Sequence, residues 1–449
     1  MTAAFRLQEK LNDWKFYFYL SDREEFQKAN QRGLNFFAEW ELIENEPVIN
    51  LNNPAYNELL NRAYLMDRRL SGGASNGLFG QLLPKYSMEK TYEILSSANQ
   101  KIRHKIEAIK PDACILFSVT TFGDYLIYMY CKERDIPTFI VRGTKIENFV
   151  NLFTDLSVLD QNNHISDENS NTVNTFLKNS RKQKIEYEGS LNYKFNLVKV
   201  FRSLIISGLV DIKRMFKVSD RHHKASSFKR VYFKEFMFPL RHSLRRNNYN
   251  SELPKDYIFF PLHAEPEIAL QLNNIKAIRQ YDLAIMIADQ IPFGKYLVLK
   301  EHPRNFGQKP SELYKKLDNH PRIKLVFDSH STSELIEKSA WVFSLSGSCA
   351  LESLIASKPI LTYVETYYTI SGMCEAVGSL DYQSMLDKVS EFEHDESKLI
   401  SLISQLLNGS RRINLYTELY KKADRAGATN DIDSLDNLIS LIKEKLSYV

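Results

Sequence analysis

The chain has 449 residues, of which 43% are apolar and 25% charged, and its formal net charge is +4 at neutral pH. This composition is typical of a folded globular protein with room for two domains of ordinary size, and it argues against a disordered chain. The small net charge gives no signal for nucleic-acid binding. The sequence contains no run of about 18 apolar residues, so no transmembrane helix is predicted.

Residues 1–150 predict a Rossmann-like domain. From residue 113 onward, a buried-type strand, a polar turn, a helix and a second strand follow one another as a β–turn–α–β unit, which favours a parallel sheet. The expected elements are a strand at 15–20, helices at 54–68 and 88–109, a strand at 113–119, a helix at 125–133 and a strand at 138–141.

Residues 151–254 predict a mainly helical connecting region with a strong basic bias. Between residues 194 and 246 the sequence has fourteen Lys or Arg and three Asp or Glu, with apolar residues at helical spacing. A basic amphipathic helix can lie on an anionic membrane surface. The alternative is an insert whose apolar stripe packs on a domain while its charges face water.

Residues 255–449 predict a second Rossmann-like, doubly wound domain followed by terminal helices. Short apolar runs alternate with helical patterns, as expected for parallel βα units. The expected strands are 257–261, 296–299, 323–327, 341–345 and 360–363, and the expected helices are 274–289, 311–317, 332–338, 349–356, 379–407, 411–425 and 431–447.

A cationic cluster follows the strand at 296–299. Lys300 and Arg304 supply positive charge, and His302 can donate a hydrogen bond. Because ligands of open α/β sheets sit at the carboxyl ends of the strands, we expect this cluster to contact a phosphate. Surface side chains of a solvated loop are the alternative.

A second cluster, Ser346, Gly347 and Ser348, follows the strand at 341–345 and opens a helix. Free backbone N–H groups at a helix start favour an anion, and glycine permits close approach of the backbone. Glu352, one turn further, could accept hydrogen bonds from a ribose. A simple helix cap and a structural glutamate are the alternatives.

Two further groups of polar residues also follow expected strands. His263 and Glu267 follow the strand at 257–261, where a carboxylate could act as a base or a nucleophile at a sugar carbon. In the first domain we expect four residues to contact an acceptor, with ordinary turn chemistry as the alternative: Thr120, Thr121, Asp124 and Arg142. No Walker sequence, dinucleotide fingerprint or metal-binding motif occurs, so no metal or cofactor is expected.

Three blocks resemble the bacterial capsule polysaccharide biosynthesis family, which includes Kdo transferases with a GT-B fold: YIFFPLHAEPE (257–267), KYLVLKEHPRNFG (295–307) and WVFSLSGSCALESLIASKPIL (341–361). His302-Pro303 and the serine cluster also resemble bacterial sialyltransferases that use CMP-activated sugars. The resemblance implies that His302, Arg304 and residues 346–348 bind the nucleotide phosphate, and that Glu352 binds its ribose. Family members carry Gln and Asp where this chain has His263 and Glu267.

The resemblance therefore implies an α/β, GT-B type chain with two facing Rossmann-like domains. It implies a cytoplasmic, metal-independent glycosyltransferase that moves Kdo or a related ulosonate from a CMP-linked donor to a capsule or lipopolysaccharide glycan. Transfer from a UDP-sugar or a CDP-polyol, a UDP-sugar 2-epimerase and a non-catalytic glycan-binding scaffold are the alternatives. Association with the inner membrane through residues 194–246 is a further expectation.

Overall fold

The computed structural model describes the following residues: 8, 10–20, 35–38, 54–67, 86–117, 119, 121–144, 146, 149–155, 170–182, 197–215, 232–237, 240, 252–263, 280–302, 311–326, 330–345, 349–366, 368–370, 372–413 and 432–447.

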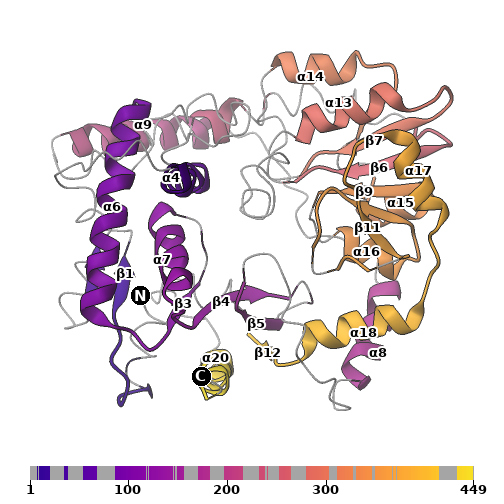
Figure 1. Cartoon of the computed structure of the whole chain (residues 1–449). Coiled ribbons are helices and arrows are strands. Elements are labelled where there is room, and N and C mark those ends of the chain that lie inside the picture. The colour runs from indigo at the N-terminus through magenta and orange to yellow at the C-terminus, as the bar shows by residue number, and fades with distance from the viewer. Residues whose placement is uncertain are drawn as a thin grey trace. The chain divides into compact units, whose positions relative to one another are not determined.

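The chain divides into two compact units, and each contains its own sheet with parallel strands (Figure 1). The first unit comprises residues 1–66, 86–169 and 403–449, and the second comprises residues 67–85 and 170–402. The α/β class with Rossmann-like units, which the sequence predicted, is confirmed by this topology.

The first unit is built on a four-stranded mixed sheet in the order β12-β5-β4-β3 and a separate parallel pair, β1 and β2. Its elements are β1 (Phe18–Leu20), β2 (Phe36–Ala38), α4 (Pro54–Met66), α6 (Met88–Ile109), β3 (Cys114–Leu116), α7 (Phe122–Glu133), β4 (Thr138–Gly143), β5 (Phe149–Phe153), β12 (Arg411–Arg412) and α20 (Ile432–Leu446).

The β–turn–α–β unit predicted in this part of the chain is confirmed. Strands β3 and β4 are parallel, with Cys114 opposite Thr138, and α7 connects them. The antiparallel strand β5 was not predicted. The Thr144 N–H donates to the carbonyl of Phe149 at 2.9 Å, and β5 pairs with β4 in the antiparallel direction.

The C-terminal helix α20 lies in the first unit, although the sequence analysis grouped it with residues 255–449. Its apolar face contributes Leu438, Leu441 and Ile442 to a buried cluster with Phe139 and Leu152 of the sheet. The helical pattern of residues 432–446 shows which face is apolar, but not which sheet it covers. Arg411 and Arg412 form a strand where the sequence predicted the start of a helix at 411–425.

Helix α7 begins with a capping box, which explains why the chain turns from strand to helix after β3. The Thr121 hydroxyl accepts from the Asp124 N–H at 3.2 Å, and the Asp124 carboxylate accepts from the Thr121 N–H at 3.1 Å. These two bonds satisfy backbone donors that the first helical turn leaves unpaired. In the same turn Gly123 lies directly against Tyr19 of β1.

The close approach of Gly123 to Tyr19 leads to a stability prediction. A Cβ added at Gly123 would overlap the hydroxyl and the ring of Tyr19. We therefore expect Gly123→Ala to lower the free energy of unfolding by about 1–3 kcal/mol, because the Tyr19 side chain, β1 or α7 must shift. Urea unfolding followed by circular dichroism measures this loss. Gly378→Ala, where the added Cβ meets nothing within 4 Å, is the control, and equal losses in the two variants would contradict the prediction.

The second unit is built on a six-stranded parallel sheet. Its elements are α8 (Ser170–Lys182), α9 (Leu197–Met215), the π-helical turn η3 (Tyr232–Met237), β6 (Tyr257–Pro261), α13 (Gln280–Gln290), β7 (Tyr296–Lys300), α14 (Ser311–Asp318), β8 (Ile323–Val326), α15 (Thr332–Lys338), β9 (Trp341–Ser344), α16 (Cys349–Ile355), β10 (Ile360–Thr362), β11 (Cys374–Ala376), α17 (Tyr382–Ser390) and α18 (Glu396–Leu407).

The strands of this sheet lie in the order β8-β7-β6-β9-β10-β11. The first strand of the unit, β6, therefore lies at the centre, with two successive strands on one side and three on the other. This is the strand order of the Rossmann fold, whose ligand crevice opens where the connections leave in opposite directions. Here that switch point lies between β6 and β9, which are parallel neighbours.

Side chains of alternate strand residues point to opposite faces of the sheet. Ile258, Phe260, Leu297 and Leu299 belong to the buried cluster that also contains residues of α13, α14 and α17. Tyr257 faces the other way, because its hydroxyl donates to the carbonyl of Leu335 in α15 at 3.0 Å. This period of two is the one expected of strands covered by helices on both faces.

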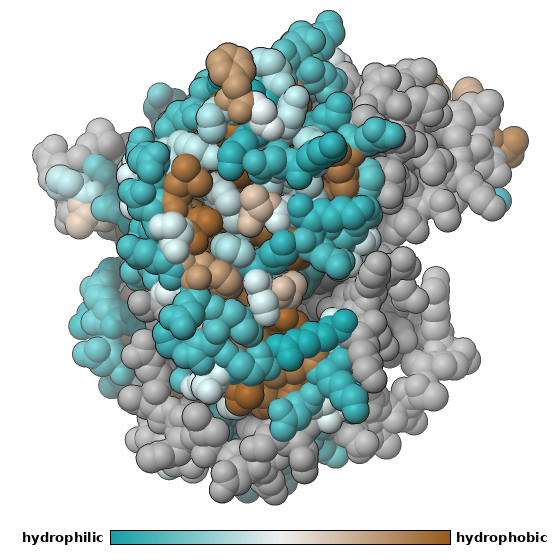
Figure 2. Space-filling model, turned by 90° about the vertical axis from the view of Figure 1, so that its right-hand side faces the viewer, coloured by the Kyte–Doolittle hydropathy of each residue, from teal (hydrophilic) through white to brown (hydrophobic). Residues whose placement is uncertain are grey.

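The side of the molecule that lies to the right in Figure 1 has a mostly hydrophilic described surface, with apolar residues in separate patches (Figure 2). Scattered exposed apolar side chains of this kind are common on folded proteins and need no special explanation. Among the described helices, none has the length and hydropathy needed to cross a bilayer.

Candidate functional site

The candidate site lies at the carboxyl ends of β6, β7 and β9. Strands β6 and β7 are in register so that Pro261 lies opposite Lys300, and β6 also pairs with β9. Residues that follow these strands therefore come together at one edge of the sheet, at the switch point. His263, Lys300, His302 and Glu352 are the predicted site residues that the structure describes at this edge.

His263 is held by a buried glutamine. Its N–H donates to the Gln280 side-chain oxygen at 2.8 Å, and the Gln280 amide donates to the His263 carbonyl at 3.1 Å. Gln280 is fully buried at the start of α13, and His263 is only 8% exposed. The two reciprocal bonds satisfy the backbone of His263 and hold the end of β6 against the start of α13.

Lys300 ends β7 and contacts the start of α15. Its ammonium donates to the His330 carbonyl at 2.7 Å and to the Thr332 hydroxyl at 3.2 Å. It is also close enough to Glu352 and Cys349 of α16 for its charge to favour their ionised forms. Lys300 thus places a positive charge between α15 and α16, and it fixes the loop that precedes α15.

Glu352 of α16 is a half-buried carboxyl group near this edge. Burial raises the pKa of its carboxyl from 4.5 to about 7, and the nearby Lys300 charge opposes the rise. A carboxyl group with a pKa near 7 exists in both protonation states under physiological conditions. Strongly shifted pKa values of this kind concentrate at functional sites.

Glu301 is a residue whose role the sequence analysis missed. It is 1% exposed, and its carboxylate accepts hydrogen bonds from the hydroxyl of Tyr281 at 3.1 Å and from that of Tyr314 at 2.9 and 2.8 Å. Burial and the Glu301 charge raise the pKa of Tyr281 well above its usual range. Glu301 therefore anchors the chain between Lys300 and His302 to α13 and α14.

A sequence signal for this orientation exists. Residues 297, 299 and 301 share one face when the period of the strand is continued past its last residue. Because Leu297 and Leu299 are fully buried in the α13–α14 core, the same period directs Glu301 into that core. From the sequence we predicted a role only for Lys300, His302 and Arg304, as a cationic cluster that contacts a phosphate.

Several predicted site residues lie outside the described residues. Of the residues that follow β7, the structure describes His302, which is half-buried. The residues that are not described are Thr120, Glu267, Arg304, Ser346, Gly347 and Ser348, so their assignments stay predictions.

The predicted acceptor residues of the first unit have local partners in the structure. Thr121 and Asp124 form the capping box of α7. The guanidinium of Arg142 lies over the ring of Phe153, with 5.4 Å between the guanidinium carbon and the ring centroid. These contacts account for the local geometry, and contact with an acceptor stays a prediction for all three residues.

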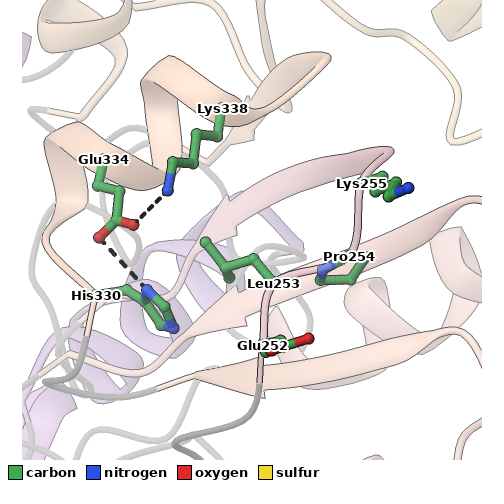
Figure 3. Close-up of a pocket in the computed structure, with 7 residues that line it drawn as sticks. All are labelled: Glu252, Leu253, Pro254, Lys255, His330, Glu334 and Lys338. Atoms are coloured by element: carbon green, nitrogen blue, oxygen red, sulfur yellow. Dashed lines mark hydrogen bonds and ion pairs between the residues drawn. The ribbon is translucent and has the colours of Figure 1, made fainter.

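A pocket of about 520 Å³ lies along α15, between this helix and the segment that precedes β6 (Figure 3). Its charged groups on α15 bind one another. Glu334 accepts from Lys338 at 2.8 Å and lies 3.4 Å from the ring nitrogen Nδ1 of His330. Because Glu252–Lys255 precede β6, the pocket reaches toward the amino ends of the strands, and we do not assign the reaction to it.

One curated protein is similar to part of this chain. Protein FixF of Sinorhizobium fredii is 26% identical over 129 residues, which are 27% of this chain and 30% of FixF. The chain therefore matches less than a third of the length of this curated relative.

Solved structures of low similarity were also found. Two are structures of KpsC from Thermosulfurimonas dismutans. The β-Kdo 2,7-transferase has a TM-score of 0.34 and 14% identity and covers 82% of this chain and 94% of its own. The β-Kdo 2,4-transferase has a TM-score of 0.37 and 12% identity, with coverages of 68% and 82%. The UDP-GlcNAc 2-epimerase of Methanocaldococcus jannaschii has a TM-score of 0.24 and 15% identity, with coverages of 95% and 99%. TM-scores this low carry no argument about activity.

The family comparison covers the strands and helices that form the candidate site. Residues 217–400 match the family described as capsule polysaccharide biosynthesis protein. This segment contains β6, β7, β9 and α16, and with them His263, Lys300, His302 and Glu352. Residues 217–400 of this chain are therefore similar to the capsule polysaccharide biosynthesis protein family.

Proposed function

We propose that this chain is a cytoplasmic glycosyltransferase of bacterial surface polysaccharide biosynthesis that takes its sugar from a nucleotide-activated donor. The observation that carries the proposal is the placement of Lys300 and Glu352 at the switch point of a Rossmann-type sheet, where nucleotides bind in open α/β folds. The family match of residues 217–400 supports a role in capsule polysaccharide synthesis.

The proposed donor is a CMP-linked ulosonate such as Kdo. In the transfer, a hydroxyl oxygen of the acceptor glycan forms a bond to the anomeric carbon, and the bond from that carbon to the phosphate oxygen breaks. The nucleotide leaves with the bonding electrons, so negative charge grows on its phosphate. Fixed cations and hydrogen-bond donors lower the barrier by stabilising that charge. We assign this role to Lys300, His302 and Arg304 together with residues 346–348.

The remaining predicted residues have roles in the same reaction. Glu352 binds the ribose of the nucleotide through its carboxylate. Glu267 takes the proton of the acceptor hydroxyl, or attacks the anomeric carbon if the configuration is retained, and His263 assists it at the end of β6. No metal ion takes part in the proposed mechanism.

A nucleotide screen tests the proposal. We expect CMP to raise the melting temperature of the protein, since a ligand at 100 times its dissociation constant stabilises the folded state by about 2.7 kcal/mol. His302→Ala should reduce this shift, and His394→Ala, in a different part of the second unit, should leave it unchanged. No shift with CMP, UDP, GDP or CDP at millimolar concentration would contradict a nucleotide-dependent enzyme.

The same screen separates the alternative donors. A shift with UDP alone would favour a UDP-sugar transferase or a 2-epimerase, and a shift with CDP alone would favour a polyol-phosphate transferase. An epimerase needs no acceptor, so release of nucleotide that requires an acceptor glycan would argue against it. A non-catalytic scaffold predicts no turnover with any donor, even where a nucleotide binds.

A further inference from the structure

Helix α9 presents large apolar side chains to solvent. Six of them, at helical spacing, are between 51% and 79% exposed: Val198, Phe201, Ile205, Ile206, Leu209 and Ile212. Residues three or four apart lie on one face of a helix, so five of these form a continuous stripe and Ile206 widens it. Isolated exposed apolar residues need no explanation, whereas a stripe of this length indicates an interaction surface.

The opposite face of α9 is the one that packs on the protein. Val200 and Ser207 are 4% and 5% exposed, and they lie about half a turn from the stripe at 100° per residue. The Ser207 hydroxyl donates to the Leu204 carbonyl at 2.9 Å, one turn earlier in the same helix. The apolar stripe is therefore not the face of α9 whose side chains are buried.

The charge of the surrounding sequence indicates what the stripe contacts. Residues 194–246 have fourteen Lys or Arg and three Asp or Glu, and Arg202 lies exposed within the stripe itself. An excess of cations in the sequence that contains an apolar stripe, with Arg202 exposed in the stripe itself, favours contact with an anionic lipid surface. It opposes a symmetric contact with a second copy, because two basic regions would then face each other.

We propose that the outward face of α9 docks on an anionic phospholipid bilayer, with the helix lying in the plane of the interface. Nineteen residues give a helix of about 28 Å. The six apolar side chains enter the boundary between headgroups and acyl chains, while Arg202 contacts lipid phosphates. This inference is independent of the proposed glycosyl transfer, because neither the stripe nor its charges belong to the candidate site.

Vesicle co-sedimentation of the full chain tests the proposal. We expect binding to phosphatidylcholine vesicles that contain phosphatidylglycerol, and weaker binding to pure phosphatidylcholine. The double variant Phe201→Gln/Leu209→Gln should lower the partition coefficient at least about tenfold, because two large apolar groups no longer enter the bilayer. Phe293→Gln is the matched control, since Phe293 is 94% exposed and lies outside α9.

Arg202→Gln is a second variant that keeps the apolar stripe intact. It should lower binding about fivefold at low ionic strength, as expected for one cation near an anionic surface. The effect should shrink as added salt shortens the Debye length.

Three results would overturn the proposal. The first is equal vesicle binding by the double variant and by Phe293→Gln. The second is a dimer in sedimentation velocity that the double variant dissolves while vesicle binding stays the same, which would assign the stripe to a second copy. The third is a lower melting temperature of the double variant with unchanged vesicle binding, which would show that the stripe packs against another part of this chain.

Discussion

Glu352→Gln is expected to lower kcat/KM for glycosyl transfer about ten- to hundredfold and, at the same time, to make the protein more stable above pH 7. The loss of activity follows if the carboxylate holds the nucleotide ribose, because hydrogen bonds to charged groups contribute about 1.5–3 kcal/mol. The gain in stability follows because an amide removes the cost of an ionised carboxylate in a poorly hydrated position.

The direction of the pKa shift of Glu352 determines whether its contribution to the free energy of unfolding rises or falls with pH. Burial raises the pKa of Glu352 from 4.5 to about 7, so between these values the folded state binds more protons than the unfolded state. The favourable contribution of the protonated carboxyl is present below pH 4.5 and is lost as the pH rises through about 7. At pH 8 the difference between Glu352→Gln and the parent protein is at most about 3 kcal/mol, and solvent at the half-buried site reduces it.

Glu334 provides a control of opposite sign. Lys338 and His330, as hydrogen-bond partners, lower the pKa of Glu334 against the opposing effect of burial. Its contribution to stability is present at pH 8 and is lost in acid, so Glu334→Gln should destabilise the protein at pH 8. Denaturant unfolding of both variants at pH 4 and pH 8 measures the two signs. If Glu352→Gln is destabilised at pH 8, the assigned shift is wrong.

Lys300→Met tests the interaction between Lys300 and Glu352 by removing the positive charge. The Lys300 charge lowers the pKa of Glu352 in opposition to burial. Without this charge, the part of the plot of kcat/KM against pH that follows the ionisation of Glu352 should move to higher pH. A purely structural role of Lys300, through its bonds to His330 and Thr332, would lower activity without moving that part of the plot. The pH profile therefore separates the electrostatic role of Lys300 from its structural one.

The Glu301→Leu variant is expected to lose about 2–5 kcal/mol of stability. The substitution removes the acceptor of two buried hydroxyls, those of Tyr281 and Tyr314, and each unsatisfied group costs about 1–3 kcal/mol. Urea unfolding measures the loss. We also expect weaker binding of the nucleotide, because Glu301 holds the chain between Lys300 and His302.

A matched series isolates this hydrogen-bond network. Glu301→Gln keeps an acceptor oxygen and should cost less than Glu301→Leu. In a Tyr281→Phe/Tyr314→Phe background, Glu301→Leu should cost less than it does in the parent protein, because no hydroxyl is then left without an acceptor. An equal cost in both backgrounds would show that these bonds are not what Glu301 contributes.

The strands of the second unit were predictable because buried parallel strands are near-continuous apolar runs. The runs at β6, β7, β8, β9 and β10 are short and bounded by polar residues, so both their positions and the polar groups at their ends could be read from the sequence. The predicted helix at 379–407 proved to be two helices, α17 and α18. Strand β11 was not predicted, because its three residues, Cys374–Ala376, have a glutamate at the centre and form no apolar run.

The sequence by itself determined that residues 257–361 form alternating strands and helices, and that Lys300, His302 and Glu352 follow or adjoin strand ends, because local apolar periodicity encodes both. Only the tertiary structure decided that β6 lies between β7 and β9, that α20 packs on the first sheet and that the apolar face of α9 is exposed. The physical reason is that a periodic pattern identifies an apolar face, whereas the partner of that face is chosen by packing between segments far apart in the chain.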